Sequence, residues 1–152
     1  MVFKFNSAKA VSYANNFSSK NNPFYKVFSN GEDCNFVSQC LLAGSDNVSD
    51  KDNWFYSSEK DFSSSWVDQN ELLAYLLSSQ KGPFGRFVNK NNVSVGDIVF
   101  LPETEQCGVG IVTKVVDDEA FFVIKKNKYE EKNIKNLQKN GIKILHILGV
   151  KK

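Results

Sequence analysis

GEDCNFVSQCLLAG, residues 31–44, is the stretch around which the fold prediction is built. Its apolar residues recur at the spacing of one helical face and predict a helix over about residues 33–43. They are Phe36, Val37, Cys40 and Leu41. Gly44 follows them, at the place where glycine commonly ends a helix in a left-handed conformation.

Cys34 stands at the start of this predicted helix, beside the acidic Asp33. The partial positive charge of a helix N-terminus makes a thiol there easier to ionise, and the thiolate is the reactive form. Cys34 is therefore a candidate nucleophile of the kind that cysteine hydrolases use. The structural alternative is a core position, because cysteine is among the residue types most often buried.

Length and composition indicate one domain over residues 1–152. Hydrophobic residues make up 41% of the chain and aromatic residues 13%, which is typical of a globular protein rather than a disordered one. The formal net charge is only +2 and the basic residues are spread out, so we expect no nucleic-acid partner. We find no transmembrane run and no signal peptide, and the sequence leaves the oligomeric state open.

The cysteines and the single histidine restrict the chemistry. Cys34, Cys40 and Cys107 are an odd, sparse set that does not form a disulfide framework. One histidine and no Cys-x-x-Cys pair give no metal-ligand spacing, and we expect neither a metal nor another cofactor. Redox chemistry through Cys34 or Cys107 is the weakest alternative, since nothing positions a resolving cysteine.

The first part of the chain, to about residue 82, has the pattern of a helical region. Either residue of the Asn-Ser pair at 6–7 can cap a helix that runs to about residue 18. Asp68 and Glu71 have the spacing of a capping box and open another helix. GPFG at residues 82–85 then predicts a turn region.

Aromatic residues are concentrated between these helices. Those of residues 24–28 are expected in the core, where aromatics dominate the packing of small domains. The polar stretch 45–60 contains Trp54 and Tyr56, which either line a binding groove or fasten the loop onto the domain.

After residue 93 the pattern changes to strands, which we expect over about residues 98–101, 109–116, 120–124 and 142–148. Asp117 and Asp118 form a tight hairpin turn between two of them. The charged run 125–139 is expected to be a solvated face. Helices in residues 1–82 followed by adjacent strands in 93–150 predict an α+β fold, with N-terminal helices packed on a C-terminal antiparallel sheet.

Short motifs along the chain, to about residue 124, resemble those of the bacterial putative amidase domain. This family is a branch of the papain-like cysteine hydrolases, related to the NlpC-type and CHAP cell-wall hydrolases. The motifs are AVSYA at 10–14, NPFY at 22–25, DCNFVSQC at 33–40, Trp54 with Tyr56, FSSSW at 62–66, GDIV at 96–99 and IVTK at 111–114. The ordered set, and NFVSQC above all, makes the resemblance specific.

The resemblance implies a papain-like, NlpC-like fold and a Cys-His hydrolase acting on an amide bond, such as one in peptidoglycan. In such a site the cysteine attacks the carbonyl, the histidine transfers its proton and a third polar residue orients the imidazole. Proteins of this family are typically exported to the cell wall. The binding groove would include Trp54, Tyr56 and Trp66 beside the positions that align with the catalytic residues.

Three departures from the family pattern affect catalysis. The family histidine should lie three residues before IVTK, where this chain has Gly108, preceded by Cys107. No clear match to the third catalytic residue occurs in residues 122–127. The nucleophile motif is one residue short, so Asp33 falls on the nucleophile position if NFVSQC keeps its register, and Cys34 falls on its neighbour. One residue turns a helical side chain by about 100°.

We therefore predict an amidase-like domain that has lost catalysis and binds a protein partner or a cell-wall peptide, through Asp33, Cys107 and Gly108 as well as the aromatic residues. The alternative is an active cysteine amidase or peptidase with Cys34 as nucleophile. It needs His146, the only histidine of the chain, to act as the base from the last strand, although a structural histidine is commoner there.

Overall fold

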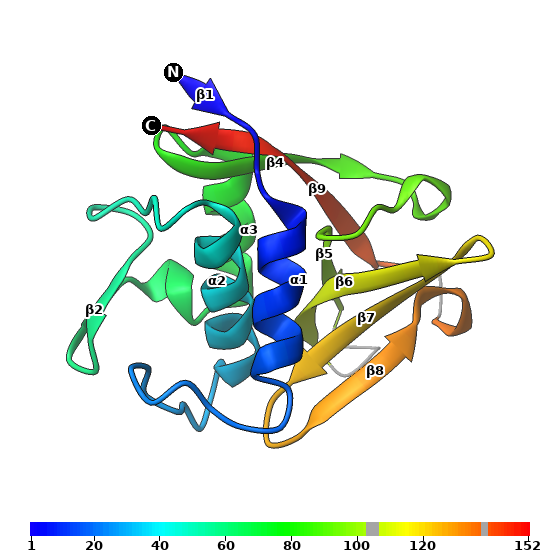
Figure 1. Cartoon of the computed structure of the whole chain (residues 1–152), viewed down its shortest axis with the longest axis horizontal. Coiled ribbons are helices and arrows are strands. Elements are labelled where there is room, and N and C mark those ends of the chain that lie inside the picture. The colour runs from blue at the N-terminus through cyan, green and yellow to red at the C-terminus, as the bar shows by residue number, and fades with distance from the viewer. Residues whose placement is uncertain (103–106, 138–139) are drawn as a thin grey trace.

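The computed structural model describes residues 1–102, 107–137 and 140–152. These residues form an α+β fold in which helices pack on a large antiparallel sheet (Figure 1). The helices are α1 (Ser7–Asn16), α2 (Glu32–Gly44) and α3 (Gln69–Ser78), with the 3-10 turns η1 (Ser64–Trp66), η2 (Lys90–Asn92) and η4 (Ile134–Asn136). The strands are β1 (Val2–Phe3), β2 (Tyr56–Ser58), β3 (Asp61–Phe62), β4 (Gly82–Val88), β5 (Ile98–Leu101), β6 (Gly108–Val116), β7 (Glu119–Lys125), β8 (Tyr129–Asn133) and β9 (Lys143–Lys151).

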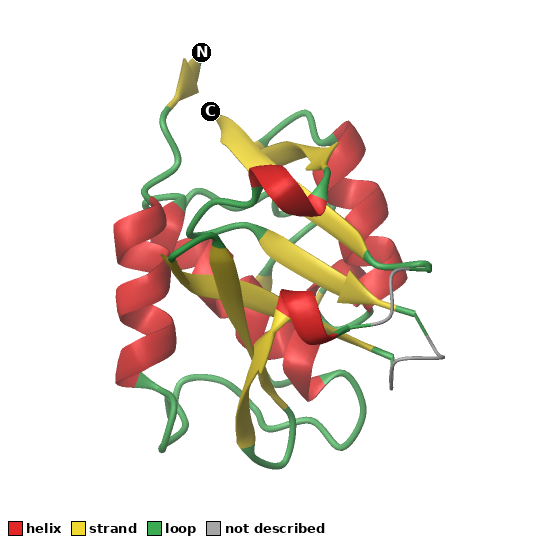
Figure 2. Ribbon diagram, turned by 90° about the vertical axis from the view of Figure 1, so that its right-hand side faces the viewer, coloured by secondary structure: helices red, strands yellow, loops and turns green. Residues whose placement is uncertain are grey.

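Strand β9 joins the two parts of the main sheet. It pairs with β4 along its length, and its other edge pairs with β5 near the start and with β1 at the end. From β5 the order continues through β6, β7 and β8, and every neighbouring pair is antiparallel. Strands β2 and β3 form a separate pair. Figure 2 shows helices on either side of the strands as seen from that direction.

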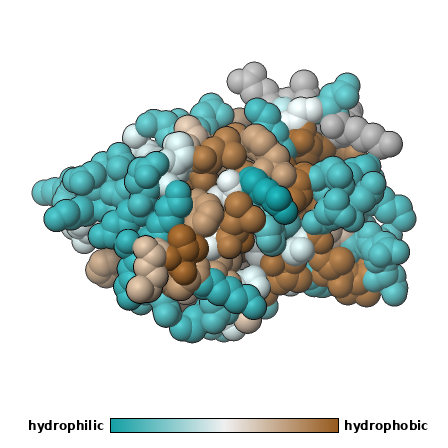
Figure 3. Space-filling model, turned by 90° about the horizontal axis from the view of Figure 1, so that it is seen from above, coloured by the Kyte–Doolittle hydropathy of each residue, from teal (hydrophilic) through white to brown (hydrophobic). Residues whose placement is uncertain are grey.

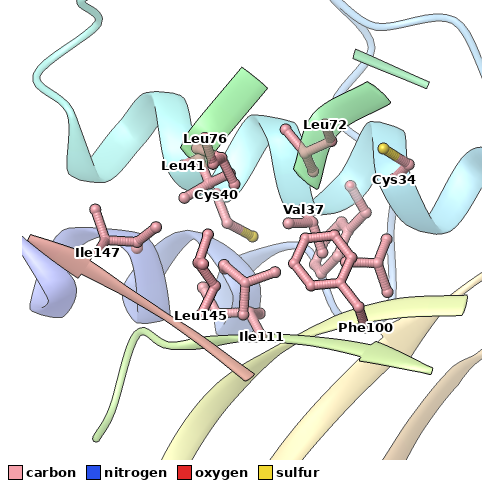
Figure 4. Packing of buried hydrophobic residues seen from close by; sticks show 14 of the residues in the cluster. Cys34, Val37, Cys40, Leu41, Leu72, Leu76, Phe100, Ile111, Leu145 and Ile147 are labelled. Carbon is pink, nitrogen blue, oxygen red and sulfur yellow. The ribbon is translucent and has the colours of Figure 1, made fainter. Parts of the chain in front are cut away.

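Side chains alternate between the two faces of this sheet, and each face has its own hydrophobic cluster. One cluster joins the sheet to the helices, and Figure 4 shows Ile111 and Leu145 of the sheet near Val37 and Cys40 of α2. The other cluster lies on the opposite face of the sheet. It contains Val112 and Ile144, which are the sequence neighbours of Ile111 and Leu145. It also contains Val99 and Phe122.

Several local predictions are confirmed. The side chain of Asn6 accepts a hydrogen bond from the Lys9 amide at 3.0 Å and caps α1. Asp68 caps α3, where its Oδ1 accepts from the amides of Asn70 and Glu71. Asp117 and Asp118 have φ values of 51° and 64° and connect β6 to β7, as a two-residue hairpin turn requires.

Gly44 does not end α2 in a left-handed conformation, so that prediction is wrong. Gly44 lies inside the helix, and the positive φ values occur at Asp46 and Asn47. A Cβ at position 44 would come within 2.5 Å of the Phe5 ring and 2.9 Å of the Asn6 carbonyl oxygen. The sequence pattern therefore found the glycine but not its role, which is the close approach of α2 to the chain before α1.

Residues 82–85 were expected to form a turn, but they begin β4, and the sheet is therefore not confined to residues 93–150. Pro83 is tolerated because β4 is an edge strand, where a missing N–H costs no ladder bond to a second neighbour. Gly85 fits because a Cβ there would collide with the carbonyl oxygen of His146. The pairing with β9 overrides the turn signal.

Lys125 corrects the prediction of a solvated charged run. It is only 8% exposed, and its ammonium donates to the carbonyl oxygens of Phe17 at 2.7 Å and Lys20 at 2.8 Å. Carbonyl groups that follow a helix have no helical partner, and Lys125 satisfies two of them while it lies over the Phe36 ring. The rest of the run forms β8 and η4, and residues 138 and 139 lie outside the described part.

The surface also departs from expectation. Phe24, from the aromatic segment predicted to be core, is 62% exposed. Figure 3 shows hydrophobic side chains gathered on the face above β1, β4 and β9, and the exposed ones on these strands are Val2, Phe87 and Leu148. Among the described residues, no helix has the length and apolar character needed to cross a bilayer.

Candidate functional site

A groove of about 640 Å³ lies where the N-terminal ends of α2 and α3 face the start of β6. Its lining comes from residues 28–34, Ser64, residues 67–71, Cys107, Lys126 and Asn127. Four residues named from the sequence are at this place, three of them in the lining and Gly108 next to it. They are Asp33, Cys34, Cys107 and Gly108.

Asp33 faces Gly108. Asp33 is in the first turn of α2 and is 7% exposed, and its Oδ2 accepts a hydrogen bond of 2.9 Å from the Val109 amide. A Cβ on Gly108 would lie 3.2 Å from the same oxygen. The Asp33 carboxylate therefore faces the glycine that stands where the resemblance predicts a histidine.

Cys34 is turned away from Gly108. It is 1% exposed, and its Sγ lies 3.9 Å from the carbonyl oxygen of Ser65 in η1. Burial raises the pKa of the thiol well above its usual range, and the charges of Asp33 and Asp68 raise it further. Both effects favour the protonated form of the Cys34 thiol.

His146 lies on the other face of the sheet. Its neighbours Leu145 and Ile147 belong to the cluster that contains Cys34, whereas Ile144 belongs to the opposite cluster. Alternation along β9 thus directs His146 away from α2, and its Nδ1 lies 2.7 Å from Oδ1 of Asp97. The structure does not bring His146 and Cys34 together.

The tryptophans serve the core rather than the groove. Trp54 and Trp66 are 0% exposed, and their ring centroids are 4.9 Å apart. Both indole N–H groups donate to α2, to Ser38 Oγ and Asn35 Oδ1. Trp54 therefore fastens its loop to the domain. Tyr56 is part-exposed, and its hydroxyl accepts from the Lys26 amide at 2.8 Å, outside the groove lining.

Cys107 and Lys126 border the groove on the sheet side. Cys107 is exposed, with its Sγ 3.3 Å from Oε1 of Gln69 on α3. The Lys126 ammonium donates to the Cys107 carbonyl at 2.7 Å. Neither Lys126 nor Gln69 is predicted from the sequence, because Lys126 is one of many lysines in a charged run and Gln69 follows a helix cap. Only the antiparallel pairing of β6 and β7 places Lys126 beside position 108.

In the described part of the chain, no three His, Cys, Asp or Glu side chains are grouped so as to hold a metal ion. Carboxylates predominate among the charged residues of the groove, which are Glu32, Asp33, Asp68, Glu71 and Lys126.

The first prediction concerns the reactivity of Cys34. In a Cys107→Ser variant, we expect alkylation of Cys34 to be slow at pH 7 and to keep rising with pH beyond about 8.5, the ordinary thiol value. The sign follows from burial, which raises the pKa and so reduces the thiolate fraction at a given pH. Alkylation rates between pH 6 and 10, with the modified residue located by mass spectrometry, test this. A plateau below pH 8 that is lost in His146→Ala would contradict the geometry.

Comparison with known proteins agrees with the motifs. Residues 4–144 match the family described as Putative amidase domain. Over 85 residues the chain is 36% identical to "Uncharacterized protein YhbB" of Bacillus subtilis (strain 168). The matched region is 53% of this chain and 27% of that protein. No solved structure gives a significant match. The family match extends over most of the length of this chain, and the chain therefore belongs to the family of the Putative amidase domain.

Proposed function

We propose that this member of the amidase-domain family binds a peptide-like ligand in the groove without hydrolysing it. The fold would be papain-like, with α2 carrying the nucleophile position and β6 carrying the base position. The ligand would be a cell-wall peptide or a segment of a protein partner, because a groove derived from an amidase is shaped for an amide-containing chain.

The observation that supports this proposal most strongly is the pairing of Asp33 with Gly108. An amidase of this class needs a thiolate and an imidazole in contact across the groove. The proposal assigns Asp33 to the first position because its carboxylate faces Gly108, and position 108 has no side chain to transfer a proton. Loss of proton transfer alone costs a factor of about 100 to 10,000 in rate.

The arrangement of the other candidates also favours binding over catalysis. The Cys34 thiol is buried, which raises its pKa, and the only histidine of the chain lies beside Asp97 on the opposite sheet face. The competing function, a cysteine amidase that uses Cys34, would need both groups to move. Cys34 does line the groove, so this competing function can be tested directly.

The test combines a cleavage assay with a binding assay on the whole chain. Tripeptides to pentapeptides capped at both ends are incubated with the protein, and products are sought by mass spectrometry. We expect no cleavage, while ¹⁵N–¹H spectra show shifts at groove amides such as those of Gly108 and Val109. Cys34→Ala should leave these shifts unchanged, because its thiol is directed toward η1.

Two outcomes would contradict the proposal. Cleavage that disappears in Cys34→Ala would assign an active cysteine amidase. Absence of any groove shift with every peptide would remove the binding function.

A further inference from the structure

Five exposed or part-exposed aromatic side chains form a row beside the groove, and we call this row the aromatic rim. Its members are Phe24, Tyr25, Phe28, Tyr56 and Phe62. We propose that the aromatic rim binds a large apolar side chain, aromatic above all, of the peptide whose backbone lies in the groove. This inference rests on the proposed binding function and names the class of residue for which the site selects.

The aromatic rim is continuous with the groove. The ring centroids of Phe24 and Tyr56 are 5.9 Å apart, and Tyr56 lies at the same distance from Phe62. Phe62 in turn contacts Phe28, with centroids 5.0 Å apart, and Phe28 lines the groove. Two segments that are separated in the sequence thus provide an unbroken run of rings from the groove to Phe24. A peptide that lies in the groove can therefore place a side chain on these rings.

The rings remain accessible although they contact one another. Phe24 is 62% exposed, its neighbour Val27 is 54% exposed, and the other four rings are part-exposed. The rim rests on the core through Tyr25, whose ring stacks on the buried Trp66 with centroids 6.0 Å apart. Exposed apolar side chains that gather in one place mark interaction sites, whereas scattered ones need no explanation. Aromatic rings also offer a large contact area to a ligand.

Polar contacts, rather than burial of its apolar side chains, hold the loop before α2. The Lys26 amide donates to the Tyr56 hydroxyl at 2.8 Å, and the Lys26 carbonyl accepts from Asn35 Nδ2 at 3.0 Å. The Phe28 amide donates to Oε1 of Glu32 at 2.9 Å. Asn35 and Glu32 are buried in the first turn of α2, so the loop is anchored to the helix that borders the groove. The rings are therefore held in place before a ligand arrives, which reduces the ordering cost of binding.

The charges of the rim favour an uncharged ligand group. The two segments that form it contain two basic and two acidic residues, which are Lys26, Lys60, Glu59 and Asp61. The Lys26 ammonium lies 5.2 Å from the centroid of the Phe28 ring and is attracted to its negative face. A balanced surface of this kind does not attract an anionic bilayer, which binds clusters of basic residues. The occupant that fits is an apolar side chain supplied by the peptide in the groove.

The experiment compares peptides that differ at one residue. Capped pentapeptides of alanine, with phenylalanine, leucine or alanine at the centre, are titrated into the whole ¹⁵N-labelled chain. We expect the phenylalanine peptide to bind about tenfold more tightly than the alanine peptide, with leucine between them, because burial of one large apolar side chain has about this effect. Shifts should occur at the amides of Lys26 and Phe28 as well as at those of Gly108 and Val109.

Variants locate the preference on the aromatic rim. Phe24→Ala should lower the affinity for the phenylalanine peptide at least about threefold, as for the loss of one aromatic pair, and leave the affinity for the alanine peptide unchanged. Phe24→Trp keeps a ring at this position and should retain the preference. Phe87→Ala is the matched control, since Phe87 is 49% exposed but lies in β4, outside the groove lining and the rim.

A lipid surface is the other occupant that an exposed aromatic cluster could take. Sedimentation of the chain with phosphatidylcholine vesicles, with and without phosphatidylserine, tests it. We expect the chain to stay in the supernatant with both kinds of vesicle. Vesicle binding that is lost in Phe24→Ala would assign the rim to a lipid surface and overturn the inference.

The outcomes separate this inference from the function on which it rests. Equal binding of the phenylalanine and alanine peptides, or a preference that survives in Phe24→Ala, would overturn the role of the rim and leave peptide binding intact. Cleavage that keeps the phenylalanine preference would overturn the non-hydrolytic function and leave the role of the rim intact. Absence of shifts with every peptide would remove both.

Discussion

Asp33→Cys combined with Gly108→His is expected to produce a reactive thiol where the native chain has none. The Cβ of the new side chain at position 108 would start 3.2 Å from the place of Asp33 Oδ2, so its imidazole can contact a thiol on the adjacent helix turn. Cysteines next to a protonated histidine have pKa values of about 3.5–7.5, against about 8.5 for a free thiol. Alkylation at pH 7 should be about tenfold or more faster than for Asp33→Cys alone.

Both variants are made with Cys34→Ala and Cys107→Ser, so that one groove thiol is followed. The matched control is Gly108→His with Cys34 present and Asp33 unchanged, which should give no acceleration because Cys34 points to Ser65. Acceleration in the control but not in the Asp33→Cys variant would mean that Cys34, not Asp33, occupies the nucleophile position. The free energy of unfolding is measured alongside, because Lys126 Cε lies 3.5 Å from a Cβ at position 108 and has to move to admit the imidazole.

Gly31→Ala is expected to lower the free energy of unfolding by about 2–5 kcal/mol. Gly31 precedes α2 with a φ of 83°, which costs about 1–2 kcal/mol for a residue with a side chain. A Cβ there would also collide with the backbone carbonyl oxygen of Val67, and such overpacking adds about 1–3 kcal/mol. Urea denaturation monitored by tryptophan fluorescence measures the change, since Trp54 and Trp66 are both buried.

Gly108→Ala serves as the control for this glycine. Its Cβ would meet only the end of the Asp33 side chain at 3.2 Å and the flexible Lys126, so the free energy of unfolding should change by no more than about 1 kcal/mol. Equal losses of free energy of unfolding in Gly31→Ala and Gly108→Ala would show that the contact between the start of α2 and the end of η1 does not stabilise this part of the fold. Because Gly31 and Val67 both line the groove, a loosened contact there should also weaken peptide binding.

Local signals in the sequence determined most of the secondary structure. The helical period of residues 31–44, the caps Asn6 and Asp68, and the hairpin turn at 117–118 are each set by neighbours in the chain. Such preferences depend on side chains within a few residues, which a sequence displays directly. The α+β class followed from the order of helices and strands.

Local signals failed where a distant partner decided the conformation. GPFG at 82–85 became a strand because β9 pairs with it, and Gly44 stayed helical because Phe5 approaches it. Lys125 became buried because carbonyl oxygens from another part of the chain accept hydrogen bonds from its ammonium. No window of sequence contains both members of these pairs.

For the site, the sequence by itself determined the candidate residues and the family to which the chain belongs. The motif NFVSQC, with one residue missing before it, left two positions for the nucleophile, Asp33 and Cys34. Only the tertiary structure decided which of the two faces Gly108, because a helical side chain turns by about 100° per residue and the packing of α2 against β6 and η1 sets its direction. The same packing placed His146 on the other face of the sheet, where the alternation of β9 is fixed by pairing with β4 and β5.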